Sequence, residues 1–178
     1  MRLQRTHGLP VAAAAGLLLA LGVASPAVAG PTTATVTITG GSLSITVPAD
    51  AGNLGTRANT VQPGTISGSL GQVQVDDARS AAAGSGWVAS VISTAFTPPA
   101  GPTIGAAAVG YVAGPITKVG TATFTANDPP DLTGAVPAVT ATGITGDNSA
   151  TWNPTITVTI AGGKAAGVYS GTITHSVV

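Results

Sequence analysis

The clearest pattern in the chain is strict alternation of apolar and hydroxyl-bearing side chains. It occurs in residues 35–39 (TVTIT), 43–47 (LSITV) and 155–160 (TITVTI). A period of two predicts strands with one face toward a core. Gly40-Gly41 separates the first two runs, which predicts a hairpin or two strands of neighbouring sheets.

A longer apolar run begins at Trp87 and extends to residue 96. Apolar side chains occupy both faces, with Ala89 and Val91 on the same face as Trp87, which is typical of a central strand. Before this run the pattern predicts a short strand, a turn and a loop, at residues 73–75, 76–77 and 78–86.

The rest of the chain predicts further short strands between turns rich in Gly, Pro, Asn and Asp. They are residues 65–70, 116–125, 136–142 and 168–178, with 104–113 as either a strand or a short helix. About nine or ten short strands without an amphipathic helix predict an all-β fold, an antiparallel β-sandwich. A barrel is the less favoured alternative.

The first 29 residues have the composition of an export signal. Arg2 and Arg5 precede a short apolar run, and Ala27-Val28-Ala29 forms an A-x-A cleavage site. A transmembrane anchor is the alternative, but the run is shorter than the roughly 20 residues that span a bilayer. We therefore expect a signal peptide at 1–29, one domain at 30–178, and a secreted protein that is extracellular or associated with the cell wall.

Charge and cysteine content limit the classes of partner and the modes of attachment that we expect. After loss of Arg2 and Arg5, four basic residues face six acidic ones, and no basic cluster remains to neutralise phosphates. We therefore expect no nucleic-acid partner, and no membrane span after cleavage. The chain has no cysteine, so a packed core must hold the domain together without disulfides. We see neither a cysteine for lipid attachment nor an LPxTG-like sorting signal, and expect any surface attachment to be non-covalent.

Two segments together resemble the WxL domain of Gram-positive surface proteins. The first corresponds to the family's V-x-V-D-x-R segment, Gly-rich turn and Trp-initiated strand, and the second to its terminal Y-x-G-T-I-T-W-x-L segment. Here they read Val73-Gln74-Val75-Asp76-Asp77-Ala78-Arg79 with Gly84-Ser85-Gly86-Trp87, and Tyr169-Ser170-Gly171-Thr172-Ile173-Thr174-His175-Ser176-Val177. The resemblance is close in these segments and loose over most of 30–178.

The resemblance implies a β-sandwich that attaches non-covalently to peptidoglycan. The two W-x-L triplets differ from the family's pattern: the first is Trp87-Val88-Ala89 and the second is His175-Ser176-Val177. Of the four signature residues only Trp87 is retained. The resemblance therefore supports the β-sandwich fold more strongly than it supports peptidoglycan binding.

The candidate binding residues each have a structural alternative. They are Trp87, Val88, Ala89, Trp152, His175 and Val177. Trp87 suits stacking on a sugar ring but equally suits the core, which we favour because large aromatics dominate core energetics. Trp152 sits beside a loop and is expected to be exposed or half-buried, either as a ligand contact or packed.

Groups that could act in catalysis or metal binding favour structural roles. His175 is a conceivable general base, but a histidine bonded beside the core is favoured, and one histidine without cysteine argues against zinc. Asp76 and Asp77 could form an acid–base pair, but neighbours on a strand point to opposite faces. A turn is favoured, with an Asp–Arg79 ion pair as the alternative.

Two Asn/Asp clusters, at 127–131 and 147–148, could offer oxygen ligands to calcium. Neither has the spacing of a calcium loop, and Asx turns explain both. We expect no cofactor and no metal.

The expected function is that of a non-enzymatic surface protein bound non-covalently to peptidoglycan or to another cell-surface protein. The alternative is a self-assembling structural subunit, because strands with few charges leave their edges open to pairing. A small hydrolase is the third hypothesis.

Overall fold

The computed structural model describes residues 33–178; the expected signal peptide at 1–29 lies outside them. The chain divides into two units, Met1–Thr37 and Ile38–Val178, and the fold below is that of the second. It contains eight strands and one short 3₁₀ helix. These are β1 (Leu43–Thr46), β2 (Gly64–Ser69), β3 (Val73–Ser93), η1 (Ala106–Ala108), β4 (Val109–Val112), β5 (Thr117–Ala126), β6 (Val136–Trp152), β7 (Thr155–Ile160) and β8 (Ile173–Val177).

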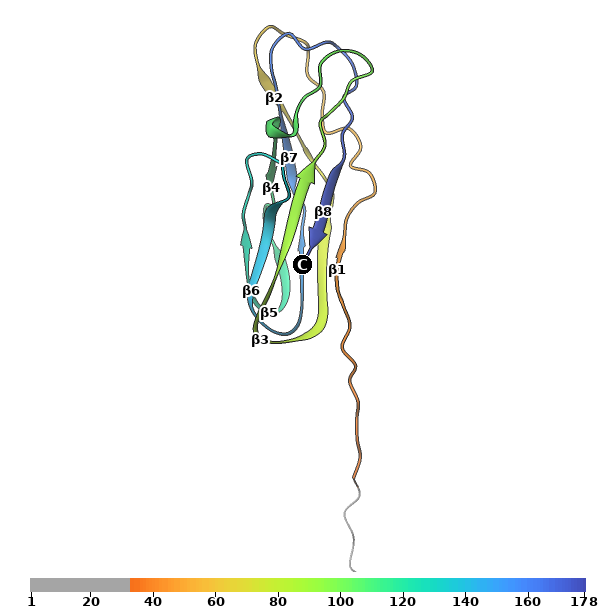
Figure 1. Ribbon diagram of the computed structural model, residues 1–178, viewed down its shortest axis with the longest axis vertical. Helices are drawn as coiled ribbons and strands as arrows, with labels where there is room; N and C mark the ends of the chain where they lie inside the picture. Colours follow the sequence, from red (N-terminus) through yellow and green to blue (C-terminus); the bar gives the residue numbers. More distant parts are fainter. Residues whose placement is uncertain (1–32) are drawn as a thin grey trace, which may run out of the picture. The chain divides into compact units, whose positions relative to one another are not determined.

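The strands form two antiparallel sheets packed against each other, which confirms the expected all-β sandwich (Figure 1). One sheet has the order β1-β3-β6-β5, with β8 also pairing with β3, and the other has the order β2-β7-β4. Alternate side chains of the strands point inward, so a period-two sequence buries one face. The core holds both tryptophans, Tyr111 and many Val, Ile and Ala side chains.

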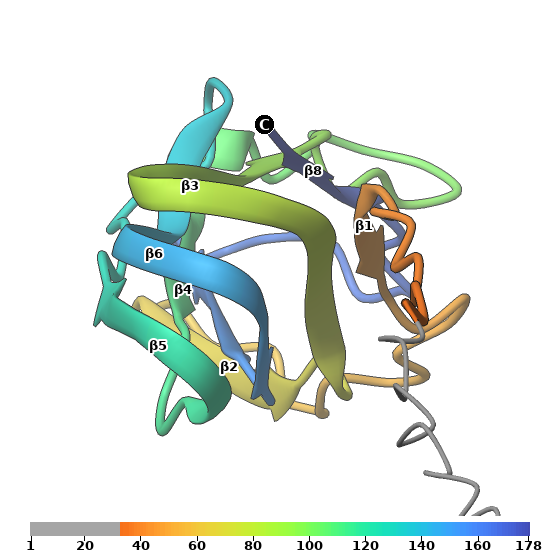
Figure 2. The same cartoon turned by 90° about the horizontal axis from the view of Figure 1, so that it is seen from below.

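β3 and β6 are much longer than the strands expected from the sequence. β3 runs through the expected turn at Asp76-Asp77 and the expected loop at 78–86, and β6 runs through the Asx turn expected at 147–148. The two turn predictions and the loop prediction are wrong, because the two strands keep pairing while both bend together (Figure 2).

The bend explains why the local sequence of β3 and β6 resembles that of turns. Residues in the left-handed region lie on both strands at this point: Ser80 (φ 53°) and Gly84 (φ 89°) on β3, and Gly143 (φ 63°) and Gly146 (φ 73°) on β6. The register shifts between Asp77 and Trp87, as extra residues are accommodated. Glycine reaches such angles without a Cβ penalty, so the same residues serve a turn or a bent strand.

Three further outcomes concern the shorter elements. Residues 35–39 belong to no strand, so the expected hairpin around Gly40-Gly41 is wrong. The last strand begins at Ile173 and excludes Tyr169. Residues 104–113 contain both of the alternatives left open, a 3₁₀ turn followed by β4.

Candidate functional site

The structure brings the two signature triplets together on adjacent strands. Residues 87–89 lie on β3 and residues 175–177 on β8, and Ala89 is directly opposite Val177. Val88 continues the pairing, because its N–H and C=O bond the C=O and N–H of Val178. Segments separated by more than eighty positions in the chain therefore form one continuous part of the sheet.

The inward side of this unit belongs to the core. Trp87 is 2% exposed, Ala89 is fully buried, and Val177 is half-buried against them. The Trp87 ring lies 5.7 Å from that of Phe124 at a tilt of 55°. This burial agrees with the core interpretation of Trp87, since a sugar ring would have to displace packed side chains to reach the indole.

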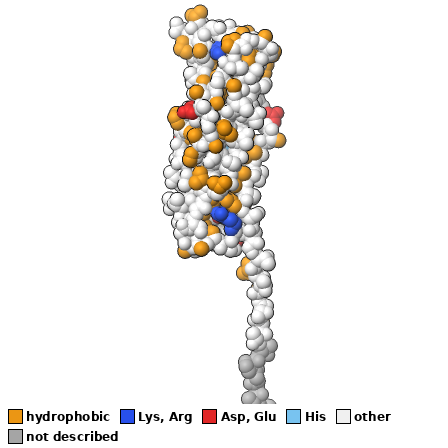
Figure 3. All heavy atoms as spheres, in the orientation of Figure 1, with side chains coloured by type: hydrophobic (Ala, Val, Ile, Leu, Met, Phe, Trp, Pro, Cys, Tyr) orange, Lys and Arg blue, Asp and Glu red, His pale blue; other side chains and the backbone are white. Residues whose placement is uncertain are grey.

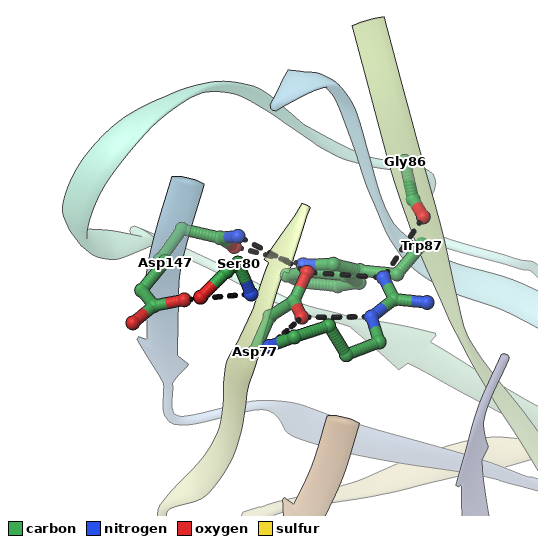
Figure 4. Close-up of polar contacts among 7 residues, drawn as sticks. Asp77, Ser80, Gly86, Trp87 and Asp147 are labelled. Atoms are coloured by element: carbon green, nitrogen blue, oxygen red, sulfur yellow. Dashed lines mark hydrogen bonds and ion pairs between the residues drawn. The ribbon is translucent and has the colours of Figure 1, made fainter. Parts of the chain in front are cut away.

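The indole N–H of Trp87 enters a polar network at the bend (Figure 4). It donates to Asn148 Oδ1 over 2.9 Å, and Asn148 Nδ2 donates to Asp77 Oδ2 over 3.1 Å. Arg79 donates to both oxygens of Asp77, from Nε over 2.8 Å and from Nη2 over 3.0 Å. It also reaches the carbonyl of Gly86 over 3.3 Å. The network therefore connects β3 before the bend, β3 after it, and β6.

The electrostatics of the network favour an ionised Asp77. Hydrogen bonds from the Arg79 side chain hold the pKa of this buried carboxyl below its usual range. The Asp–Arg79 ion pair, expected as an alternative, is present. Asp77 has no free oxygen aimed at solvent, which suits a structural role.

Asp76 does not converge with Asp77 as an acid–base pair would. Asp77 is buried, whereas Asp76 is half-buried and takes two hydrogen bonds from Gln74 Nε2, at 2.9 and 2.8 Å. Successive strand residues point to opposite faces, as expected from the sequence.

A second polar chain connects the two sheets through Trp152, Tyr111 and His175. The Trp152 indole donates to the Tyr111 hydroxyl over 2.7 Å, and that hydroxyl lies 3.2 Å from His175 Nε2. Trp152 is 2% exposed, so the expectation of an exposed or half-buried side chain at a loop edge is wrong. Pairing of β6 with β3 and β5 carries it inside.

Burial determines the charge state of this chain. It lowers the pKa of His175 from 6.5 to about 4, so the imidazole is neutral at pH 7 and, in the tautomer with the proton on Nδ1, its Nε2 accepts from the Tyr111 hydroxyl. Burial also raises the pKa of Tyr111 above its usual value, which keeps the hydroxyl protonated. A neutral imidazole bonded beside the core is the state favoured from the sequence.

The aspartates of the Asn/Asp clusters accept hydrogen bonds from backbone N–H groups. Asp128 accepts from Ala113, Asp131 from Thr133, and Asp147 from Ser80, all within 3.2 Å. Only the Asp131–Thr133 contact spans two residues, as an Asx turn does. Asp128 and Asp147 instead accept from N–H groups far along the chain, so the Asx-turn interpretation is wrong for the cluster at 147–148, which lies inside β6. Within residues 33–178 no three His, Cys, Asp or Glu side chains are grouped as metal ligands.

A groove of about 950 Å³ lies between the two sheets, and no local sequence pattern predicts it. Apolar side chains from both sheets and neighbouring loops line it, including Ile66, Val158, Ile173 and Phe96. Residues 48–60 and 164–172 form its walls. Figure 1 shows these loops at the end of the domain opposite the bend.

Sequence reasoning missed Asn148 and Tyr111 as partners of the two tryptophans. Each lies far along the chain from its tryptophan, so no local spacing relates them. The available signal was chemical: a buried indole N–H needs an acceptor, and few buried polar side chains could supply one.

No helix within the described residues is long and apolar enough to cross a membrane. Comparison with known proteins found no match to this chain among family models, curated proteins or solved structures.

Proposed function

We propose that this chain is a non-enzymatic surface protein that attaches non-covalently to peptidoglycan or to another cell-surface protein, as the resemblance to WxL domains implies. The observation that carries the proposal is the pairing of the two signature triplets on β3 and β8, with Ala89 opposite Val177. A binding unit built from two distant segments requires a fold that makes them neighbours, and this fold does so.

The binding surface in this proposal is the outward face of the two paired strands. Its inward side is occupied by the core, which leaves the outward side chains for a partner. They are Val88, Ser90, Ile92, Thr174 and Ser176. Hydroxyl groups both donate and accept hydrogen bonds, and the aliphatic side chains between them suit the apolar faces of a sugar or a protein surface.

The surface as a whole is poor in charge. In the face shown in Figure 3, uncharged groups and scattered small apolar side chains predominate. Binding in this proposal therefore depends on hydrogen bonds and apolar contact, and is expected to depend weakly on salt.

The non-enzymatic part of the proposal is supported by the partners of the candidate catalytic groups. His175 Nε2 lies against the Tyr111 hydroxyl, and Asp77 is bonded by Arg79 and Asn148. Each of these groups would have to give up a core contact in order to meet a substrate.

Export is part of the same proposal. The signal peptide expected at 1–29 would deliver the domain at 30–178 to the outside of the cell. N-terminal sequencing of the protein from culture medium and wall fractions tests this, and a start at Gly30 is the expected result.

The test of binding is a pull-down of residues 30–178, which contain every described strand, on purified peptidoglycan. We expect saturable binding that is weakened by Thr174→Glu, on the outward face of β8. The matched control is Thr65→Glu, which makes the same change at an exposed position of β2 in the other sheet. Equal loss in both variants, or no binding by the unmodified chain to peptidoglycan or to any protein of the wall fraction, would contradict the proposal.

A self-assembling subunit is the second candidate. The observation that favours it is an exposed alternating segment before β1, in which Val36 and Ile38 are 90% and 89% exposed.

A further inference from the structure

We propose that residues 35–39 of one copy of this chain insert, as an added β-strand, into the groove of a second copy. The segment and the groove are unrelated to the outward face of β3 and β8, so this inference is independent of the wall-binding proposal.

Residues 35–39 have the alternating pattern of a β-strand but pair with no strand in this structure. Residues 35–39 read TVTIT, belong to no strand, and expose Val36 and Ile38 almost completely. Two residues apart on an extended chain, these side chains point to the same face. The segment can therefore offer one apolar face and one threonine face to a second protein surface.

The groove has the matching chemistry. Its apolar lining includes Ile66, Val158, Ile160 and Ile173, which come from β2, β7 and β8. The two cations that line it are already engaged: Lys164 Nζ donates to the Thr103 carbonyl, and Arg57 Nη2 donates to the carbonyls of Gln62 and Pro63. The uncharged segment therefore meets a surface without an unsatisfied cation.

The same features favour a peptide strand over a glycan in this groove. Sugars are commonly held by the faces of exposed aromatic side chains. Here Phe96 is buried and the Tyr169 hydroxyl already donates to the Ala165 carbonyl. The groove has a volume of about 950 Å³, and the aliphatic part of its lining suits alternate Val and Ile side chains of an extended chain.

The groove lies where a sandwich is open to an added strand. Residues 48–60, which wall it, are coil; the backbone of Leu54 covers the face of β2 at Gly68, and β2 is an edge strand of its sheet. Free strand edges and coil-covered gaps are the usual points at which a strand from another chain is accepted.

Sedimentation velocity of residues 30–178 over a range of concentrations tests the proposal. We expect concentration-dependent association, weakened at least about tenfold in the double variant Val36→Asp/Ile38→Asp, because two apolar side chains would lose their burial. Val61→Asp is the matched control, since Val61 is 85% exposed in a loop outside both the segment and the groove. It should associate like the unmodified chain.

A mixing experiment identifies the two partners. Val168 lines the groove and is 76% exposed, so Val168→Arg blocks the site without disturbing the core. Each variant alone should be monomeric. Their mixture should form one-to-one dimers, because Val168→Arg supplies an intact segment and Val36→Asp/Ile38→Asp supplies an intact groove.

Three results would overturn the proposal. The first is a chain that stays monomeric at all concentrations. This includes the case in which hydrogen exchange shows residues 35–39 protected in the monomer, because the segment would then pair within its own copy. The second is unchanged association in the double variant. The third is a mixture that remains monomeric while both variants keep the melting temperature of the unmodified chain.

Discussion

The two tryptophans occupy similar positions in the core but belong to different kinds of polar network. Trp87 donates to Asn148 in a network that contains the ionised Asp77–Arg79 pair, and this network joins parts of one sheet across its bend. Trp152 donates to Tyr111 in a neutral chain that ends at His175 and joins one sheet to the other. Both are 2% exposed, so burial alone does not distinguish them.

The difference shows how a chain without disulfides stabilises a sandwich of small side chains. The charged network holds a strained bend, where the backbone adopts left-handed angles and the register shifts. The neutral chain holds the packing of two sheets, where a charge would be costly to bury. The two networks should therefore respond differently to mutation and to acid.

The largest expected effect is that of removing Trp87. Trp87→Ala should lower the free energy of unfolding by about 3–5 kcal/mol, because it leaves a cavity beside Phe124 and deprives Asn148 of its donor. Urea denaturation followed by circular dichroism measures it. A variant that unfolds like the original chain but loses wall binding would show that Trp87 is a ligand contact.

Breaking the charged network should have the next largest effect. Asp77→Ala should destabilise by about 3 kcal/mol, at the low end for a buried ion pair because the Arg79 side chain is 37% exposed. Asp76→Ala is the matched control, since the half-buried Asp76 accepts only from Gln74, and about 0.5–1 kcal/mol is expected. Equal losses would mean that the network does not stabilise the bend.

The neutral chain should give the protein a pH dependence of its own. The folded pKa of His175 is about 4 against 6.5 unfolded, so the unfolded state takes up a proton first as the pH falls. Stability should therefore decline between about pH 6.5 and 4, by roughly 2 kcal/mol after allowance for residual exposure.

His175→Gln keeps a hydrogen-bonding side chain and removes the titration. Thermal unfolding of this variant should lack the decline between pH 6.5 and 4, whereas the loss from Asp77 should remain. The pKa of Asp77 is lowered, so its contribution is present above about pH 4 and disappears only in stronger acid. An unchanged pH profile in His175→Gln would refute the assignment of the decline between pH 6.5 and 4 to His175.

The smallest effect tests the bend backbone. Gly146→Ala should destabilise by about 1 kcal/mol, because Gly146 has φ 73° and open space around the missing Cβ, so only conformational strain is added. Gly105→Ala is the control: Gly105 has φ −69° and similar open space. Chemical denaturation of the pair should separate them, and equal stabilities would argue against strain at the bend.

Much of the architecture could be predicted from local patterns. The alternation in residues 155–160 became β7, and residues 65–70 became β2, because a period of two suits only a strand with one buried face. The same logic failed for residues 35–39, which alternate equally well but pair with nothing in this structure. A strand requires a partner, and the pattern does not specify one.

The site was less predictable. The sequence places Trp87 in the core and His175 beside it as members of a two-part signature, but the direct opposition of Ala89 and Val177 depends on sheet order and register. Trp152 was misplaced because its neighbours, Asn153 and Pro154, resemble a loop. Its indole is buried by contacts with residues more than forty positions away, such as Tyr111.

The sequence by itself determined the all-β class, the inward face of most strands, and the need for a core without disulfides, because these depend on residue type and on a period of two. The tertiary structure alone decided that β3 and β6 bend without ending, that Trp87 and Trp152 find acceptors in Asn148 and Tyr111, and that a groove opens between the sheets. These features depend on contacts between residues distant in the chain, which local pattern does not encode.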